Sequence, residues 1–299
     1  MLTVSQLLVA VGAFLVLIAF TATVVSLVTA RRVPVRPAAR AVLVGAGGPA
    51  VSEDAPLGMP QTVPVRSWYA RVTTWLALLA LTGALVARGI AVGHGPFANQ
   101  YEFAVALAWG LLAAYGYAAW RDVAGGADAL GLVVLPITLA ALLYATTTGG
   151  SAGPLVPALQ HHLLLTVHVF SAVVAYGAAG VACAAAVLQL LPRRPSWLPS
   201  ERVLDQLAYR SVAVAFPLLT VMLVLGSVWA ERAWGTFWSW DPKETAALVT
   251  WLIYGAYLHA RVVRGWRGQR ASWLLVAGFA AVLFTYLGNH FLGGLHSYA

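Results

Sequence analysis

The densest group of chemically capable side chains lies at positions 229–244, which read "WAERAWGTFWSWDPKE". Four of the chain's 12 Trp fall in this stretch, directly before a run of charged residues: Trp229, Trp234, Trp238 and Trp240. Flat indole rings beside cations suit a flat apolar ligand that carries carboxylates, such as a porphyrin. Two other interpretations stay open: an interfacial belt of aromatic residues in a membrane protein, or a surface on which another protein docks.

Histidines are the second group of candidate binding residues. The chain has seven: His94, His161, His162, His168, His259, His290 and His296. Neutral imidazole binds haem iron well, and one histidine from each of two segments makes a bis-His site. The alternative is a hydrogen-bonded packing histidine, because an isolated imidazole is costly inside a membrane. His168 and His296 are one candidate pair, but the sequence does not tell which histidines lie together.

The charged half of the stretch predicts the start of a helix. Asp241 is a favourable N-cap, Pro242 suits the first helical turn, and Glu244 has the spacing of a capping box. The residues before Asp241 are then expected to form a loop. No side chain in the sequence has the setting of a dedicated general acid or base, so no catalytic residue is predicted.

The elements that position these residues are predicted to be membrane helices. The chain is 61% hydrophobic and only 9% charged, with a mean hydropathy of +0.80. About 20 apolar residues cross the core of a bilayer as a helix. Eight runs meet this requirement, at about 4–30, 70–92, 101–120, 129–147, 161–191, 206–230, 245–264 and 272–292. The expected fold is therefore all-α, a polytopic transmembrane helical bundle.

Charge and cysteine content exclude other classes of function. The net charge of +8 would suggest a nucleic-acid partner in a soluble protein, but here it follows the pattern of membrane orientation, so no nucleic acid is expected. The single cysteine, Cys183, lies in an apolar helix and is interpreted as a packing residue. No CxxC or CxxCH motif is present, which excludes a dithiol carrier and covalent c-type haem on this chain.

The distribution of Lys and Arg predicts the orientation of the spans. Fifteen of the 18 lie in four segments between spans, at 31–71, 121–128, 192–210 and 261–271. The positive-inside rule puts these segments in the cytoplasm, and both termini with the Trp-rich stretch outside. His259 then lies in the inner half of its span. Three parts are expected: an N-terminal transmembrane helix (1–30), a cytoplasmic linker rich in Pro, Gly and Arg (31–67), and a seven-helix domain (68–299) with an external loop at 229–244.

Residues 234–244, "WGTFWSWDPKE", closely resemble the tryptophan-rich WWD signature of haem-handling proteins in cytochrome c maturation. Across about residues 70–299 the chain is similar to the CcsA (ResC-like) family of System II. The similar segments are "GHGPFANQYEF" at 93–103, "HVFSAVVAYG" from His168, "WLIYGAYLHAR" at 251–261 and "YLGNHFLGGLHSYA" at 286–299. The chain departs from the family pattern at Ala299, where Gly is usual, and in the extra histidines near the external site, His161, His162 and His290.

The resemblance implies a set of roles for these residues. His168 and His296 would be the axial ligands of haem at an external site, held by Trp229, Trp234, Trp238, Trp240 and Asp241. His259 would bind a second haem within the membrane, together with a histidine of a separate ResB-like (CcsB-type) subunit. The bound cargo would be haem b, and the chain would belong to a holocytochrome c synthase (haem lyase) complex in the bacterial plasma membrane.

The function implied is movement of haem from the inner side to the external site and its presentation to the CxxCH thiols of apocytochrome c. A thioredoxin-like protein would keep these thiols reduced. Two alternatives stay open: a haem exporter with no part in thioether formation, and a b-type electron-transfer membrane cytochrome. The second alternative requires a partner histidine for His259 within this chain.

Overall fold

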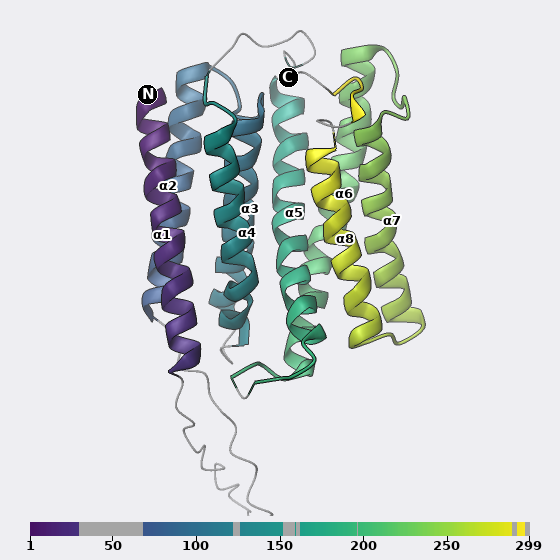
Figure 1. Ribbon diagram of the computed structural model, residues 1–299. Helices are drawn as coiled ribbons and strands as arrows, with labels where there is room; N and C mark the ends of the chain where they lie inside the picture. Colours follow the sequence, from purple (N-terminus) through teal and green to yellow (C-terminus); the bar gives the residue numbers. More distant parts are fainter. Residues whose placement is uncertain are drawn as a thin grey trace, which may run out of the picture.

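Eight long helices run side by side in the computed structural model, which describes residues 1–29, 68–121, 126–151, 159, 162–195, 197–288 and 292–296, without the side chain of residue 162 (Figure 1). They are α1 (Leu2–Val28), α2 (Trp68–Val92), α3 (Gln100–Arg121), α4 (Gly131–Thr147), α5 (His162–Leu190), α6 (Glu201–Trp234), α7 (Pro242–Val263) and α8 (Gln269–Leu287), with a short 3-10 helix η1 (Gly126–Leu130) before α4. Within the described chain, all eight spans are long and apolar enough to cross a membrane. The predicted all-α transmembrane bundle is confirmed, and the predicted linker at 31–67 lies outside the described residues.

Helix α5 lies at the centre of the bundle, with α1–α4 on one side and α6–α8 on the other (Figure 1). It packs most extensively against α6, α3 and α8. Small residues permit this central position: Gly110 of α3 and Gly177 of α5 approach so closely that a Cβ on Gly177 would collide with the Gly110 carbonyl. Residues 182–186 of α5 are also fully or almost fully buried. Small side chains at such crossings let the backbones of membrane helices come into contact.

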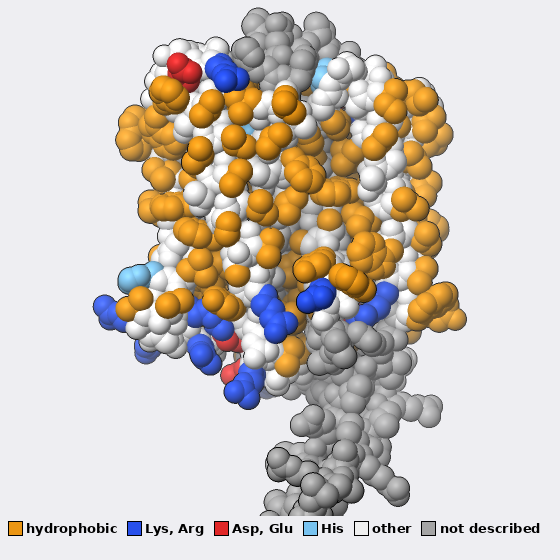
Figure 2. All heavy atoms as spheres, turned by 180° about the vertical axis from the view of Figure 1, so that it is seen from behind, with side chains coloured by type: hydrophobic (Ala, Val, Ile, Leu, Met, Phe, Trp, Pro, Cys, Tyr) orange, Lys and Arg blue, Asp and Glu red, His pale blue; other side chains and the backbone are white. Residues whose placement is uncertain are grey.

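The two ends of the bundle differ in charge. The upper end in Figure 1 carries Met1 and the connections at 93–99, 148–151, 235–241 and 292–296. Figure 2 shows one face of the molecule, with hydrophobic side chains along most of its height and Lys and Arg side chains gathered mostly near the lower end. The orientation of the spans is predicted from this separation of charge. That the lower, positively charged end faces the cytoplasm stays a prediction.

The junction between α6 and α7 differs from the predicted loop at 229–244. Helix α6 continues to Trp234 and ends at Gly235, whose φ of 75° gives a left-handed C-cap. The loop therefore comprises only residues 235–241, because Glu, Arg and Ala favour the helix and Gly235 is the first residue suited to end it. Asp241 accepts the Lys243 N–H as the N-cap of α7 and forms the capping box with Glu244, so the predicted helix start is confirmed.

A buried ion pair fixes the upper end of the bundle. Arg88 Nε of α2 donates to Glu102 Oε1 of α3 at 2.8 Å, and both side chains are almost completely buried. The same guanidinium donates to the carbonyls of Gly150, at 2.7 Å, and Ser151, at 3.2 Å. Buried charges are stable only when they are paired and hydrogen-bonded in this way. The network therefore joins α2, α3 and the segment after α4 into one wall.

Candidate functional site

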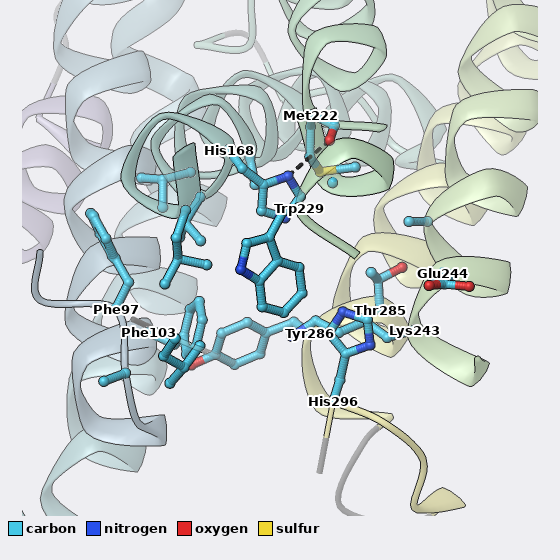
Figure 3. A pocket seen from close by; sticks show the side chains of 18 of the residues that line it. Phe97, Phe103, His168, Met222, Trp229, Lys243, Glu244, Thr285, Tyr286 and His296 are labelled. Atoms are coloured by element: carbon cyan, nitrogen blue, oxygen red, sulfur yellow. Dashed lines mark hydrogen bonds between the residues drawn. The ribbon is translucent and has the colours of Figure 1, made fainter. Parts of the chain in front are cut away.

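A cavity of about 470 Å³ lies at the upper end of the bundle, enclosed by parts of α3, α5, α6, α7 and α8 (Figure 3). Its volume falls in the range of ligand-binding pockets, roughly 300–1,000 Å³. Apolar and aromatic side chains form most of its wall, and a few polar groups lie among them. Among the predicted site residues, it is lined by His168, Trp229, Trp238 and His296.

His168, on α5, is held in one tautomer by the backbone of α6. Its Nδ1 lies 2.8 Å from the carbonyl oxygen of Met222, the contact drawn as a dashed line in Figure 3. A carbonyl only accepts hydrogen bonds, so Nδ1 carries a proton and donates; in the neutral ring Nε2 then carries the lone pair. Gly226 makes room for the ring, because a Cβ there would come within 2.8 Å of His168 Cε1.

His296 is held in the same way by a carboxylate. Its Nδ1 lies 2.9 Å from Asp241 Oδ1. Burial, and next the charge of Lys243, lower the pKa of the His296 imidazole from 6.5 to about 4, so the ring is neutral at pH 7. A neutral ring donates to an ionised carboxylate through Nδ1–H, which leaves the lone pair on Nε2.

Asp241 is the group that ties the C-terminal segment to the start of α7. Its carboxylate also accepts the N–H of Lys243, at 2.9 Å, and of Leu295, at 2.6 Å. Burial alone would raise the pKa of this carboxyl, but the Lys243 N–H, the contacts with His296 and the Leu295 N–H hold it below its ordinary 3.8. Asp241 is therefore ionised and positions His296, as the partner of a metal-binding histidine commonly does.

The indole of Trp229 lies between the two imidazoles (Figure 3). It stacks on the His168 ring with centroids 6.4 Å apart and planes 10° apart, and its centroid is 5.7 Å from that of His296. Trp234 meets both Trp229 and His296 edge-on, each at 4.7 Å. Trp229 and Trp234 belong to the last turns of α6, so the helix and not a loop sets their direction.

The other two Trp residues lie in the loop before α7. Trp238 lines the cavity, whereas Trp240 does not and is 69% exposed. Trp240 meets Trp238 edge-on at 5.7 Å, and its φ of 59° turns the chain just before the Asp241 cap. The four Trp residues of the signature thus occupy three different settings.

Of the remaining histidines, the structure keeps His259 away from this cavity. His259 is exposed on α7 and shares one face of that helix with Leu252, Ala256 and Val263, all exposed. His94 Nδ1 lies 2.8 Å from the carbonyl oxygen of Gly95, outside the main cavity. Among the residues described, no three His, Cys, Asp or Glu side chains form a metal-binding cluster. His161, His290 and the side chain of His162 lie outside the described residues.

The cavity thus presents two imidazoles, each with Nδ1 engaged by a fixed acceptor and with Nε2 as the nitrogen that can bind a ligand. They lie on either side of an interval that now holds a flat aromatic ring. The sequence did not indicate the acceptor of His168, because Met222 contributes only its backbone carbonyl. The arrangement suits two-sided ligation of a metal carried by a flat, apolar ligand.

Comparisons with known proteins identify the family of the chain. Residues 97–296 match the model of the family described as cytochrome C assembly protein. The cytochrome c biogenesis protein CcsA of Guillardia theta is 37% identical over 256 residues, an alignment that covers 76% of this chain and 84% of that protein. CcsA of Gloeobacter violaceus is 35% identical over 287 residues, with 75% and 84% covered.

A solved structure named Cytochrome c Heme Lyase CcmF shares the fold. It superposes with a TM-score of 0.65 at 18% sequence identity and covers 95% of this chain, which spans about half, 46%, of that protein. At this identity the likeness concerns the arrangement of helices. Taken with the family match and the CcsA relatives, it leads to one conclusion: the chain belongs to the cytochrome c assembly family, is a multi-pass membrane protein of the CcsA type, and takes part in cytochrome c maturation.

Proposed function

We propose that the cavity binds haem b as cargo, with His168 and His296 as the two axial ligands of its iron. The observation that carries this proposal is the matched setting of the two imidazoles in one apolar cavity. Each Nδ1–H donates to a fixed acceptor, the Met222 carbonyl or the Asp241 carboxylate. Such partners orient the ring and raise the basicity of the other nitrogen, which favours metal binding through Nε2.

Trp229 governs access to this ligand pair. Its indole fills the interval between the two rings, so it must leave that interval before one iron atom contacts both histidines. An indole and a porphyrin are both flat and apolar, so the same walls suit either of them. Trp238, which lines the cavity, offers a further aromatic surface for the bound ring.

The chain's contribution to thioether formation is positioning. In that reaction each apocytochrome thiol adds across a haem vinyl group: a C–S bond forms, and the thiol hydrogen goes to the neighbouring vinyl carbon. The addition needs reduced thiols and no oxidant. The thioredoxin-like partner keeps these thiols reduced. A haem held rigidly on both faces offers its edge to two thiols in a fixed geometry, and such orientation accelerates the reaction. The active synthase is the complex of this chain with its ResB-like subunit.

His259 belongs to a second haem site in the inner half of the membrane. Its exposure on α7, beside Leu252, Ala256 and Val263, supports ligation shared with the ResB-like subunit rather than with this chain. Haem passes from this inner site to the cavity, which faces the outside of the bacterial plasma membrane. An intramembrane histidine without such a role would be costly.

The test uses the complex of this chain with its ResB-like subunit, co-expressed and purified in detergent. We expect a six-coordinate, low-spin haem spectrum that His168→Ala and His296→Ala each abolish at the external site, with loss of cytochrome c maturation. His94→Ala is the matched control, since His94 lies at the same end but outside the main cavity. If both ligand variants leave spectrum and maturation intact, the assignment is wrong.

A second arm of the test concerns the route of haem and the exporter alternative. His259→Ala should reduce haem at both sites, and unchanged loading of the external site would contradict the inward-to-outward route. Haem released outside the cell by this chain without apocytochrome or partner would identify an exporter instead.

A further inference from the structure

Lys243 places a positive charge in the wall of the cavity. It is the second residue of α7 and the only Lys or Arg that lines the cavity among the described residues. Its Nζ lies 5.1 Å from the centre of the Phe103 ring, on α3. Within that same part of the chain, its ammonium forms no hydrogen bond or ion pair, although an ammonium has three N–H donors to satisfy. A cation that faces an aromatic ring in an apolar cavity retains the capacity to bind an anion.

The neighbouring carboxylates are already engaged by other donors. Asp241 accepts from two backbone N–H groups and from His296. Glu244 also lines the cavity, but its Oε2 accepts from the backbone N–H and hydroxyl of Ser239 and from the Asp241 N–H. Asp241 offsets the charge of Lys243 only through space. The Lys243 ammonium in the cavity wall is therefore left to pair with an anionic group of a ligand.

Tyr286, near the end of α8, adds a hydroxyl to the same region. Its ring lines the cavity, and Figure 3 shows its hydroxyl directed toward Phe103. The hydroxyl oxygen is buried and has no hydrogen-bond partner in the described part of the chain. Leaving a buried donor unpaired is destabilising. Such an unmet donor in a cavity wall indicates a group that a ligand satisfies.

We infer that the Lys243 ammonium and the Tyr286 hydroxyl, both of which are directed toward Phe103, form a subsite for a carboxylate carried by the ligand. This inference rests on the proposed function, in which the ligand is a porphyrin and the carboxylate is one of its propionates. Haem carries its propionates and vinyl groups on different edges. The subsite therefore fixes which edge faces the wall at Phe103 and turns a vinyl-bearing edge away from it. Lys243 and Tyr286 are positioning residues for the thiol addition.

The experiment compares ferric haem with its dimethyl ester, in which both propionates are uncharged, on the purified complex with the ResB-like subunit. We expect the unmodified complex to bind free-acid haem about 10- to 100-fold more tightly than the ester, as for loss of a hydrogen-bonded charge pair. Lys243→Gln should reduce this ratio at least about tenfold, and Lys243→Arg should restore most of it. Tyr286→Phe should reduce it by a smaller factor. The matched control is Arg232→Gln, because Arg232 is an exposed cation in the last turn of α6, at the same end of the bundle as Lys243.

The outcomes separate the subsite from the proposed function. A six-coordinate spectrum that depends on His168 and His296, combined with an unchanged acid-to-ester ratio in Lys243→Gln, overturns the subsite and leaves the haem site standing. An equal ratio change in Arg232→Gln overturns it too, since general surface charge would then explain the preference. Failure of the unmodified complex to bind either compound through the two histidines contradicts both proposals.

Discussion

Replacing Asp241 with Asn tests how the C-terminal histidine is held. The carboxylate serves three donors through two oxygens: Lys243 N and His296 Nδ1 on Oδ1, and Leu295 N on Oδ2. In Asp241→Asn one oxygen becomes an NH2 group, so a donor instead of an acceptor faces either the Leu295 N–H, or both His296 and the Lys243 N–H. If the NH2 faces His296, the ring changes tautomer and its lone pair moves to Nδ1, away from the proposed iron.

The expected magnitude follows from these contacts. A hydrogen bond to a charged acceptor contributes about 1.5–3 kcal/mol, and one between neutral groups about 0.5–1.5 kcal/mol. In Asp241→Asn the His296 ring exchanges a charged acceptor for a neutral one and is less firmly oriented. The expected result is about 10- to 100-fold weaker metal binding, the usual cost of removing such a partner. Helix α7 should survive the change when the amide oxygen accepts the Lys243 N–H, because Asn is then as good an N-cap as Asp.

The assay measures haem dissociation from the purified complex by transfer to an excess of apomyoglobin, alongside thermal unfolding. The matched control is Glu244→Gln, which alters the same capping box without a contact to His296. We expect faster haem loss in Asp241→Asn and nearly unchanged loss in Glu244→Gln. Equal haem loss in the two variants, or none in Asp241→Asn, would refute the role given to the Asp241–His296 contact.

Three further predictions follow from the geometry. Trp229→Ala should speed haem uptake, measured by stopped-flow absorbance, because the interval between the imidazoles is then open; slower uptake would contradict the access role. The same change should lower the free energy of unfolding by about 3 kcal/mol or more, because it removes a large buried side chain. Arg88→Met should cost about 3–5 kcal/mol because it leaves Glu102 buried and unpaired, whereas Arg71→Met, in a partly exposed pair, should cost clearly less in the same unfolding assay. The ligand-free complex should lose thermal stability as the pH falls from about 6.5 to about 4: the pKa of His296 is lowered to about 4 by burial, so the unfolded chain binds the proton first, and His296→Gln should flatten this part of the profile.

The features predicted correctly from the sequence are those that depend on residues close together in the chain. The spans follow from runs of apolar residues, and the start of α7 follows from Asp241, Pro242 and Glu244, which lie within four positions of one another. The end of α6 was predicted less well. Trp-rich sequence suggested a loop, but the helix continues to the first residue that readily takes a left-handed cap, Gly235.

The contacts that build the candidate site are long-range and have no local signature. His168 meets the Met222 carbonyl across 54 positions, and His296 meets Asp241 across 55. A backbone carbonyl is common to every residue, so its role cannot appear in the sequence. The four Trp of the signature look equivalent in the sequence, yet the phase of α6 buries Trp229 while the turn at Trp240 exposes that ring.

The most direct test of the central claim is the experimental structure of the haem-loaded complex. We predict iron bound to Nε2 of both His168 and His296, with each Nδ1 still donating to the Met222 carbonyl or the Asp241 carboxylate. We also predict that the Trp229 indole has left the interval between the two rings. Iron held by any other histidine at this end of the molecule, or haem bound with Trp229 still between His168 and His296, would show that this pair is not the proposed haem site.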